Sequence, residues 1–482
     1  MPSQKLRIAF IHPDLGIGGA ERLVVDAALG LQKLGHSVDI YTSHHDRGHC
    51  FEETRDGTLH VHHVVPPFPR AIKGKLHIVF SHARQLHLTA HLLRAGAPRY
   101  DVFFVDQLST CIPFLRAFAH TRVLFYCHFP DKLLADGAYI EGTAKRGSVL
   151  KRIYRLPMDF LEEVTTKQAD TILANSNFTV SVFKRHMLSI AKTPRVVYPG
   201  INFDAYAPPD AAQRADPDIA QIASDRPTLL SVNRFEQKKN GVLAIQSFAL
   251  LRKRLVATTD ESLRSLRLVL AGGYDPRLLD NVKTLEAMLD SAKTHGLTYA
   301  LLTPSTSTVP LPSYSSTASS PQSADIIFLL NFSGPQRSAL LTASSTLVLL
   351  YTPANEHFGI GPVEGMICGL PVLAANSGGP TESVVDVPPA EKTGWLREPS
   401  PGVWAEALEE IVGLSDGERR ELGERARRRA REKFGMEAMA KDLEEALRQT
   451  AAMGPVPTPV GVWVALAIFF GLLAYFVQLA LL

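Results

Sequence analysis

The fold is decided by the first stretch of the chain, LRIAFIHPDLGIGGAERLVVDAALGL, residues 6–31. Its first six residues, LRIAFI, form a β-rich run that is typical of a buried strand. After the glycines, apolar residues recur at helical spacing from Leu23 onward and predict a helix over 20–34. A second β-rich run, SVDIYTS, follows at 37–43. Strand, helix and strand in this order predict a βαβ unit, whose two strands run parallel.

The alternation of strands and helices continues through the rest of the chain. Further strands are predicted over 101–107, 122–128, 171–176 and 195–201, and then over 228–235, 267–273, 345–353 and 371–379. Parallel sheets of this kind are covered by helices on both faces. The predicted fold class is therefore α/β, with two doubly wound Rossmann-like domains that face a cleft. We expect an N-terminal domain over 1–205, a linker over 206–227, a second domain over 228–449, and a flexible Ser/Thr/Pro-rich insertion in it at 304–323.

The composition is that of an ordinary globular protein. Of the 482 residues 45% are hydrophobic and 21% charged, and 51 basic against 48 acidic residues leave a formal charge of +3. These values exclude a largely disordered chain and a histone-like polycation, so we predict no nucleic-acid partner. The four cysteines lie far apart and form no C-x-x-C pair, which is typical of reduced thiols in a protein that faces the cytosol.

The C-terminal end of the sequence carries a membrane signal. Residues 460–482 contain no charged residue and are numerous enough to cross a hydrocarbon core of roughly 30 Å as a helix. Many arginines and lysines precede this stretch between 425 and 448, which favours the cytoplasmic side for the rest of the protein. We predict a C-terminal transmembrane helix. The alternative is a buried terminal helix that is apolar on all sides.

A second membrane signal lies between residues 57 and 100, where 44 consecutive residues contain no acid but six lysines and arginines. Such a segment favours an interfacial helix, or a pair of helices, on an anionic membrane surface. An ordinary surface helix pair is the alternative. The seven histidines of this segment are not paired with carboxylate or thiolate ligands at a recognised spacing, so we predict no metal site.

The glycines after the first strand point to phosphate recognition. Gly16, Gly18 and Gly19 allow a close backbone approach, and the following helix directs its positive N-terminal end toward an anion. A dinucleotide-binding fingerprint would need a third glycine where Glu21 stands and an acid at the end of the second strand, where Asp39 instead lies in mid-strand. A dehydrogenase is therefore disfavoured, and a plain turn is the alternative to a phosphate site.

The second domain offers cations and acids near its strand ends. Arg234, Lys238 and Lys239 follow a strand in SVNRFEQKKN, where fixed cations could neutralise a diphosphate leaving group. In NEHFGIGPVEG, Glu356 is expected in a loop and Glu364 in the first turn of the next helix, where it could accept bonds from ribose hydroxyls. The loop between them, with Phe358, Gly359 and Ile360, offers amides to phosphate or sugar oxygens. The alternative is a helix-capping Glu364 with an unrelated Glu356.

Together these motifs resemble those of the retaining glycosyltransferases with a GT-B fold, and more narrowly those of the eukaryotic dolichol-pathway α-1,3/α-1,6-mannosyltransferases. The resemblance extends from about residue 6 to about 400. It is carried by the blocks HPDLGIGGAERLVVDAALGL (12–31), DRGHCFEE (46–53), DQLSTCIP (106–113), LFYCHFPD (124–131), NRFEQKKN (233–240), AGGYDPR (271–277), LYTPANEHFGI (350–360) and NSGGPTES (376–383). Two features depart from the family pattern: the 304–323 insertion, and Gly365 at a helical position where alanine is usual.

The resemblance implies an activity and a location. Proteins of this family transfer mannose from GDP-mannose to a one-mannose chitobiose on dolichyl diphosphate, adding α-1,3 and then α-1,6 branches. They do so at the cytosolic face of the endoplasmic reticulum membrane, in a step of protein N-glycosylation. The implied partners are GDP-mannose, the dolichyl-diphosphate-linked oligosaccharide and the membrane, and could include other transferases of the pathway. No cofactor or metal is implied, because the departing diphosphate itself helps to deprotonate the acceptor.

The resemblance also implies roles for individual residues. Glu356 would contact the transferred mannose, and His128 would reach the same sugar from the other domain. Arg234 and Lys239 would stabilise the departing diphosphate, and Glu364 would bind the ribose. The remaining members of the predicted donor site are Lys238, Phe358, Gly359 and Ile360, with Gly18 and Gly19 leaving room for donor phosphate and acceptor.

Two other functions remain open from the sequence. One is another lipid-directed transferase with the same fold, which uses a UDP-sugar or builds a phosphatidylinositol glycan. The other is a non-catalytic scaffold that organises neighbouring transferases. The presence of both cations and both acids, Arg234, Lys239, Glu356 and Glu364, argues against the scaffold, which has no physical need of them.

Overall fold

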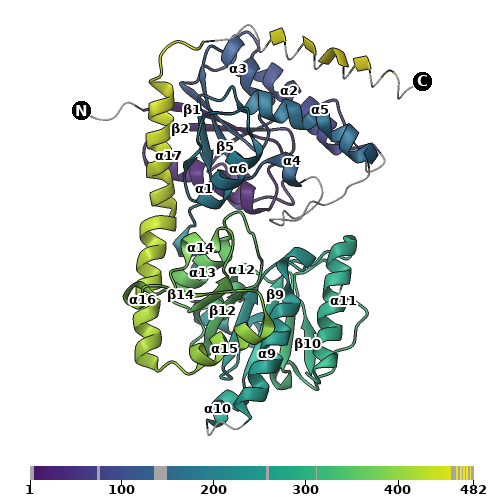
Figure 1. The fold of residues 1–482 in the computed structure, drawn as a ribbon, viewed down its shortest axis with the longest axis vertical. Coiled ribbons are helices and arrows are strands. Elements are labelled where there is room, and N and C mark those ends of the chain that lie inside the picture. The colour runs from purple at the N-terminus through teal and green to yellow at the C-terminus, as the bar shows by residue number, and fades with distance from the viewer. Residues whose placement is uncertain are drawn as a thin grey trace. The chain divides into compact units, whose positions relative to one another are not determined.

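The structure is a computed structural model that describes residues 5–72, 76–134, 149–256, 260–310 and 312–457, together with 463–464, 467–468, 470–472, 474–475 and 478. The chain forms two compact units (Figure 1). The first contains 1–201 and returns at 436–482, and the second contains 202–435. Each unit is described by itself below.

The first unit is built on a parallel sheet with the strand order β3-β2-β1-β4-β5-β6-β7. Its strands are β1 (Arg7–His12), β2 (Ser37–Thr42), β3 (His60–His63), β4 (Val102–Asp106), β5 (Arg122–Cys127), β6 (Thr171–Ala174) and β7 (Arg195–Val196). Its helices are α1 (Gly19–Lys33), α2 (His77–Leu92), α3 (Ile112–Phe118), α4 (Asp131–Leu134), α5 (Val149–Thr166), α6 (Asn177–His186) and α17 (Met436–Ala451), with a 3₁₀ turn η1 at Glu52–Thr54. The strand order reverses between β1 and β4, and sheets of this type bind ligands beyond the carboxyl ends of the strands at such a point.

Helix α17 belongs to the first unit, which corrects the predicted second domain over 228–449. A break at Gly435 separates α16 from α17, which packs against α1. Gly30 of α1 makes this contact possible, because a Cβ added there would lie 2.7 Å from the Cβ of Ala440. The apolar face of α17 completes the core above the sheet with Met439, Leu443, Ala446 and Leu447. The sequence predicts a helix that continues from about 416 to 449 in the second domain, and it does not indicate that the last part of this helix covers the first sheet.

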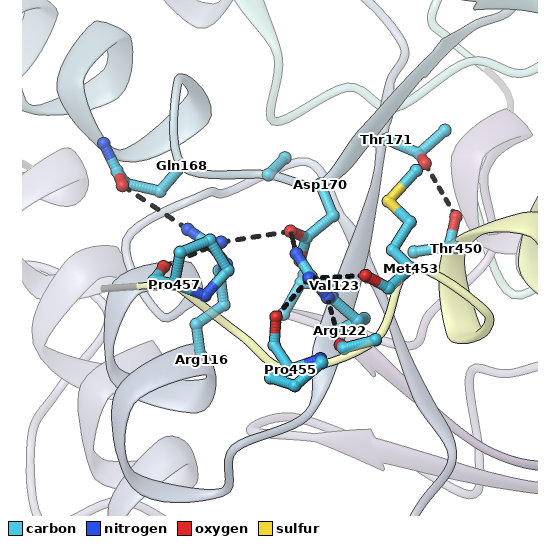
Figure 2. Close-up of polar contacts among 12 residues, drawn as sticks. Arg116, Arg122, Val123, Gln168, Asp170, Thr171, Thr450, Met453, Pro455 and Pro457 are labelled. Atoms are coloured by element: carbon cyan, nitrogen blue, oxygen red, sulfur yellow. Dashed lines mark hydrogen bonds and ion pairs between the residues drawn. The ribbon is translucent and has the colours of Figure 1, made fainter. Parts of the chain in front are cut away.

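A buried ion cluster fastens the chain that follows α17 to this unit (Figure 2). Asp170 accepts a hydrogen bond from Arg122 Nη1 (2.6 Å) and forms an ion pair with Arg116 Nη2 (3.1 Å), and all three side chains are largely buried. The two guanidinium groups in turn donate to main-chain carbonyls of the segment 453–457, namely Met453, Gly454 and Pro455 from Arg122 and Pro457 from Arg116. Four carbonyls of an otherwise irregular and exposed segment are thereby bonded to the two arginines.

The second unit repeats the architecture with the strand order β10-β11-β9-β8-β12-β13-β14, again all parallel. Its strands are β8 (Thr228–Val232), β9 (Arg267–Gly272), β10 (Tyr299–Leu302), β11 (Ile326–Leu330), β12 (Thr346–Tyr351), β13 (Val372–Ala375) and β14 (Gly394–Arg397). Its larger helices are α9 (Gly241–Leu255), α11 (Leu279–Thr294), α12 (Gly334–Thr342), α13 (Ile360–Cys368), α15 (Pro401–Val412) and α16 (Asp416–Phe434). Short turns complete it: η2 (Phe203–Tyr206), α7 (Ala211–Arg214), α8 (Pro217–Ala220), η3 (Gln237–Lys239), α10 (Glu261–Arg264), η4 (Pro321–Ser323), α14 (Pro380–Ser383) and η5 (Pro389–Glu391).

The segment 304–323, predicted to be a flexible insertion, is hydrogen-bonded to the edge of this sheet. Thr317 donates its main-chain N–H to the carbonyl of Tyr299, and its hydroxyl accepts from the N–H of the same residue at 2.8 Å. The hydroxyl of Ser316 accepts from Leu301 N at 3.1 Å. Both partners lie in β10, the edge strand of the sheet. The Ser- and Thr-rich segment thus covers an edge that would otherwise be open to pairing with other chains.

The packing of α13 against the sheet explains why position 365 is a glycine. A Cβ added to it would lie 2.8 Å from Leu349 Cδ2 and 3.1 Å from Val372 Cγ2. These two residues belong to β12 and β13, so the glycine lets α13 lie close against the sheet. An alanine here would require the Leu349 side chain to move.

The two membrane predictions have different outcomes. No helix among the described residues is long and apolar enough to cross a membrane, and most of the predicted transmembrane helix at 460–482 lies outside those residues. In the acid-free segment, α2 packs Leu88 and Leu92 into the core beside the sheet, so this face is not available to lipid. The exposed apolar side chains of the segment are instead in the chain before α2: Val65, Phe68, Ile72 and Leu76.

Candidate functional site

An ion pair joins two neighbouring strand ends in the second unit. Lys239 Nζ lies 2.6 Å from Glu356 Oε1. Lys239 ends η3, just after β8, and Glu356 lies in the loop after β12, and these two strands pair side by side. Both side chains are mostly buried, at 13% and 21% exposed. The hydroxyl of Tyr351 also hydrogen bonds to the Glu356 carboxylate. Two of the predicted catalytic residues therefore share one site at the carboxyl edge of the sheet.

The Glu356 carboxylate is held in its ionised form. Burial alone would raise the pKa of Glu356, but the adjacent Lys239 ammonium outweighs burial and lowers it. The same burial, together with the negative charge of Glu356, raises the pKa of the Tyr351 hydroxyl well above its ordinary value. Tyr351 is therefore a hydrogen-bond donor to a fixed carboxylate rather than an acid at physiological pH.

Two further cations lie beside this pair and are more exposed. Arg234 Nη1 lies 2.9 Å from Glu236 Oε1, and Lys238 Nζ lies 3.3 Å from Glu236 Oε2. The side chain of Arg234 is 65% exposed, against 15% for Glu236. Glu236 thus holds two cations at the surface of the site, where an anionic ligand can reach them.

The loop that carries Glu356 is fixed from behind by glycines. Gly379 N donates to the carbonyl of Glu356 at 2.8 Å, and a Cβ at Gly379 would lie 2.2 Å from Phe358 Cα. Gly359 has a φ of +83°, and a Cβ there would lie 2.8 Å from the hydroxyl of Tyr351. Phe358 is 3% exposed and its ring lies 5.6 Å from that of Phe434. Phe358 therefore serves the predicted donor site through its backbone, because its side chain lies in the interior.

Glu364 lies one turn farther into the helix than predicted, since α13 begins at Ile360. The first turn of α13 contains no acid, so the predicted placement of Glu364 there is wrong. Its carboxylate is positioned by two side chains instead. Tyr206 donates its hydroxyl to Glu364 Oε1 at 2.6 Å, and Arg337 Nη1 lies 3.4 Å from the same atom. The guanidinium of Arg337 also lies over the ring of Tyr206, at 4.3 Å from its centroid.

In the first unit, Gly18 and Gly19 open α1. Gly18 precedes the helix in an extended conformation that any residue adopts, so its backbone does not require glycine. A Cβ there would meet only the flexible end of Glu21, and among the described residues nothing lies within 4 Å of a Cβ added at Gly19. The Glu21 carboxylate therefore lies at the start of α1, next to Gly18, and the predicted phosphate site there stays a prediction.

His128, after β5, is held by a buried carboxylate. Its Nε2 lies 2.6 Å from Asp106 Oδ1, and the other oxygen of Asp106 lies 2.9 Å from Nδ1 of His12. These residues follow or end the adjacent strands β5, β4 and β1. Asp106 and His12 are fully buried, and His128 is 20% exposed. A carboxylate between two imidazoles fixes the ring of His128, which stays partly exposed.

Asp106 and His12 shift each other's pKa toward the charged forms. Burial would raise the pKa of Asp106, but His128 and His12 outweigh it and lower the pKa to about 2. Burial would lower the pKa of His12, but the hydrogen bond to Asp106 and the negative charges of Asp106, Glu21 and Asp14 together outweigh burial and raise it. His12 Nε2 is buried with no hydrogen-bond partner among the residues that the structure describes.

The predicted site residues therefore fall into two groups. The second unit brings together Arg234, Lys238, Lys239, Glu356, Phe358, Gly359, Ile360 and Glu364, and the first unit holds Gly18, Gly19 and His128. Sequence motifs missed the residues that position them. Glu236, Tyr351 and Asp106 stand inside the quoted motif blocks and could have been found there. Tyr206 and Arg337 lie outside every motif, and no sequence signal connects them to Glu364.

Comparison with known proteins agrees with the fold. The profile of Glycosyltransferase Family 4 matches residues 17–205, and that of Glycosyl transferases group 1 matches residues 316–429. Similar solved structures include a sucrose-phosphate synthase from Thermosynechococcus elongatus, with a TM-score of 0.66 and 20% identity over 92% of this chain and 99% of that one. The catalytic domain of starch synthase IV from Arabidopsis thaliana has a TM-score of 0.63 and 14% identity over 93% and 100%. These likenesses establish the GT-B fold.

Curated relatives are much closer in sequence. The α-1,3/1,6-mannosyltransferase ALG2 of Rhizomucor pusillus is 46% identical over 92% of this chain and 92% of its own. The protein of the same name from Saccharomyces cerevisiae is 40% identical over 92% of this chain and 84% of its own. Identity at this level over nearly the whole length exceeds what a shared fold alone produces. The chain belongs to the ALG2 family of α-1,3/1,6-mannosyltransferases.

Proposed function

We propose that the protein transfers mannose from GDP-mannose to a dolichyl-diphosphate-linked Man-GlcNAc-GlcNAc acceptor, adding an α-1,3 and then an α-1,6 mannose. The observation that carries the proposal is the buried Lys239–Glu356 pair beside the exposed Arg234, within a chain so similar to named α-1,3/1,6-mannosyltransferases. The names of those relatives give the two linkages. The donor and the acceptor follow from the family resemblance.

The chemistry is a front-face displacement that retains configuration at the sugar. The bond between the anomeric carbon of mannose and the β-phosphate oxygen breaks, and GDP departs with the bonding electrons. The acceptor hydroxyl oxygen bonds to the same face of that carbon and gives its proton to the departing phosphate oxygen. Both charges that develop, on the sugar and on the diphosphate, need electrostatic stabilisation by fixed groups.

The site of the second unit suits this division of charge. Arg234, with Lys238 beside it, offers exposed cations to the diphosphate, and Lys239 adds a third from within the site. The ionised Glu356 faces the positive charge that develops on mannose. Glu364, fixed by Tyr206 and Arg337, accepts hydrogen bonds from the ribose. The family resemblance assigns His128 of the first unit to the mannose, and Asp106 would set the orientation of its ring.

The reaction as proposed requires no metal ion. In many nucleotide-sugar enzymes a divalent cation neutralises the diphosphate, and here the three cations of the second unit would do so. This part of the proposal makes a direct prediction, namely that a chelator leaves transfer unchanged.

The proposal includes a membrane location. The uncharged stretch 460–482 would form a C-terminal transmembrane helix in the endoplasmic reticulum membrane, with both units on the cytosolic side. The ring of Trp463, at the start of this stretch, lies 5.8 Å from that of Phe114 and 5.6 Å from that of Phe118 in α3. Phe118 is also 63% exposed. These aromatic side chains would lie at the membrane interface, where such rings are common.

The testing experiment incubates the detergent-solubilised protein with GDP-mannose and a lipid-linked one-mannose chitobiose, with and without chelator, and measures product masses. Two added hexoses in both conditions are expected. A product that needs added metal would overturn the metal-independent mechanism. Transfer from a UDP-sugar to another lipid would assign the rival transferase function, and no transfer from any donor would favour the scaffold.

A further inference from the structure

The first unit contains a cavity of about 330 Å³ that the proposed mechanism does not use. It is lined by Asp14, Ser43, Arg70, His77, Ser81 and Arg84, beside Pro13. A volume of this size holds a ligand fragment rather than a single water. None of these residues belongs to the group around His128 or to the start of α1.

The cavity lies where parallel sheets bind their ligands. Asp14 follows β1 and Ser43 follows β2, so one wall is formed at the carboxyl edge of the sheet. The opposite wall is the beginning of α2, where His77, Ser81 and Arg84 share one face at helical spacing. The amides at the N-terminus of this sixteen-residue helix contribute a positive potential to the same space.

The charge of the cavity favours an anion. Asp14 lies between two guanidinium groups, bonded to Arg70 Nη2 and 3.4 Å from Arg84 Nη2. Arg84 Nη2 also donates to the carbonyl of Ser43 at 2.8 Å. Two cations against one carboxylate leave a net positive charge. In the described part of the chain, the hydrogen bonds of both arginines use Nη2, so that Nε and Nη1 remain for a ligand.

Arg84 is buried at a cost that an anionic ligand would offset. Its residue is 6% exposed, and burial lowers its pKa despite the nearby Asp14. Asp14 is shared with Arg70, whose side chain is 56% exposed. A guanidinium held in place but short of counter-charge is a common arrangement for recognising phosphate oxygens.

The chain beside the cavity is apolar and exposed. Phe68 and Ile72 lie two residues before and after Arg70, and they are 42% and 50% exposed. Val65 and Leu76 are 70% and 43% exposed. Exposed apolar side chains next to a cationic cavity suit a ligand with an anionic head and a hydrocarbon chain.

We propose that this cavity binds the diphosphate of the lipid-linked acceptor, with Arg70 and Arg84 on its oxygens and the lipid chain along Phe68 and Ile72. This inference rests on the proposed function and adds the place of the acceptor. The strand order puts β5, which precedes His128, two strands from β1, or roughly 10 Å at about 4.8 Å per strand. A short oligosaccharide spans that distance, so the sugar end of the acceptor reaches His128 while its diphosphate stays in the cavity.

The test uses the full-length protein in a non-ionic detergent with two acceptors. One carries Man-GlcNAc-GlcNAc on a polyprenyl diphosphate, and the other carries the same sugars on a neutral alkyl chain. The wild type is expected to have the lower KM for the diphosphate acceptor. Arg70→Gln and Arg84→Gln should each reduce this preference by about 10-fold or more, since each removes a charge-assisted hydrogen bond. Arg94→Gln is the matched control, because Arg94 is an exposed arginine just beyond the same helix, and it should keep the preference.

A binding measurement separates this inference from the proposed function. Fluorescence anisotropy of a labelled polyprenyl diphosphate needs no mannose transfer. Weaker binding to Arg70→Gln, with Arg94→Gln unchanged, supports the cavity even if the enzyme transfers another sugar. Arg70 is exposed, so its variant is expected to fold where Arg84→Gln fails. Equal binding and equal KM ratios in all variants would overturn the inference. Equal binding of phosphatidylinositol in place of the diphosphate would also overturn it, because the cavity would then recognise membrane headgroups.

Discussion

Lys239 and Glu356 stand 117 positions apart in the sequence, yet Nζ of one lies 2.6 Å from Oε1 of the other. Neighbouring parallel strands, β8 and β12, bring them together, because each residue follows the carboxyl end of its strand. The pair is mostly buried, and removing two charges from water costs free energy. A role in stabilising the fold is therefore a weak explanation for the pair. In the proposed mechanism the two residues stabilise the opposite charges that develop on sugar and diphosphate.

The first prediction concerns Glu356. Glu356→Gln keeps the shape of the side chain but removes the charge that faces the reacting sugar, so kcat should fall by about 100-fold or more. Glu356→Ala should abolish transfer while membrane association remains. Steady-state kinetics with GDP-mannose and the lipid-linked acceptor measure the first effect, and sedimentation with membranes the second. Glu398→Gln, an exposed acid of the same unit, is the control. Undiminished turnover in either Glu356 variant would refute the site.

The second prediction concerns the positioning of Glu364. Tyr206→Phe removes only the hydroxyl that donates to Glu364 at 2.6 Å. If Glu364 binds the ribose, the KM for GDP-mannose should rise by about 10-fold, since a hydrogen bond to a charged group contributes roughly 1.5–3 kcal/mol. The control is Tyr314→Phe, which removes an equally short bond to Glu286 at the surface of the same unit. Equal KM values for both variants would argue against a role of Glu364 in the donor site.

The third prediction concerns the backing of the Glu356 loop. Gly379→Ala would place a Cβ 2.2 Å from Phe358 Cα, a contact that only a backbone shift relieves. The variant should lose about 1–3 kcal/mol of unfolding free energy and most of its activity. Gly402→Ala is the matched control, because in the described structure nothing lies within 4 Å of its added Cβ. It lies in α15, where alanine should stabilise the helix by about 0.5–1 kcal/mol. Denaturant unfolding compares the two, and equal stability would contradict the packing described.

The sheets could be predicted from the sequence because their central strands are buried on both faces and appear as short apolar runs. Sequence patterns missed four strands, and three of these, β3, β10 and β14, are edge strands of four residues each. An edge strand pairs with one neighbouring strand only, so burial dictates fewer of its residues and its apolar pattern in the sequence is weak. The return of α17 to the first unit was also missed. Its amphipathic pattern requires a core but does not specify which of two sheets supplies it.

The candidate site was predictable to the extent that it lies in short motifs. Arg234, Lys239 and Glu356 follow strand ends, where parallel topology gathers them. The partners that orient the site come from elsewhere. Tyr206 lies in a turn at the start of the second unit. Asp106 is the last residue of β4, and this position does not distinguish it from other aspartates at strand ends. Their roles depend on distances that only the folded chain fixes.

The fourth prediction concerns Asp106 and pH. The pKa of Asp106 is lowered to about 2 in the folded protein, so its ionised form stabilises the fold above pH of about 4, and this stabilisation is lost as the pH falls toward 2. Asp106→Asn cannot titrate and should flatten the loss of unfolding free energy in that window. Asp101→Asn, at the opposite end of the same strand, is the control, since its carboxylate accepts a bond from Arg7 N in an exposed position. If the unfolding free energy of Asp106→Asn falls as steeply below a pH of about 4 as that of the wild type, Asp106 is not held in its ionised form by His12 and His128.

Asp106 should also affect catalysis through His128. Misorientation of the ring should lower kcat by about 10- to 100-fold in Asp106→Asn. In a His128→Ala background the same change should cost little more, because the interaction that it breaks is already gone. Additive losses would instead mark Asp106 as a structural residue without a role in positioning His128.

The fifth prediction concerns the ion cluster below the C-terminal segment (Figure 2). Arg122→Gln removes the donors to Met453, Gly454 and Pro455 and leaves Asp170 buried with one counter-charge fewer. Because breaking a buried pair leaves an uncompensated charge, the first unit should lose roughly 3 kcal/mol. Arg195→Gln breaks an exposed pair with Glu445 and should cost less than about 1 kcal/mol. Limited proteolysis should then cut near residue 454 faster in Arg122→Gln than in Arg195→Gln, because only the former frees this backbone from its partners. Equal cleavage rates would mean that the segment is held by its apolar contacts, such as Trp463 on α3, rather than by the arginines.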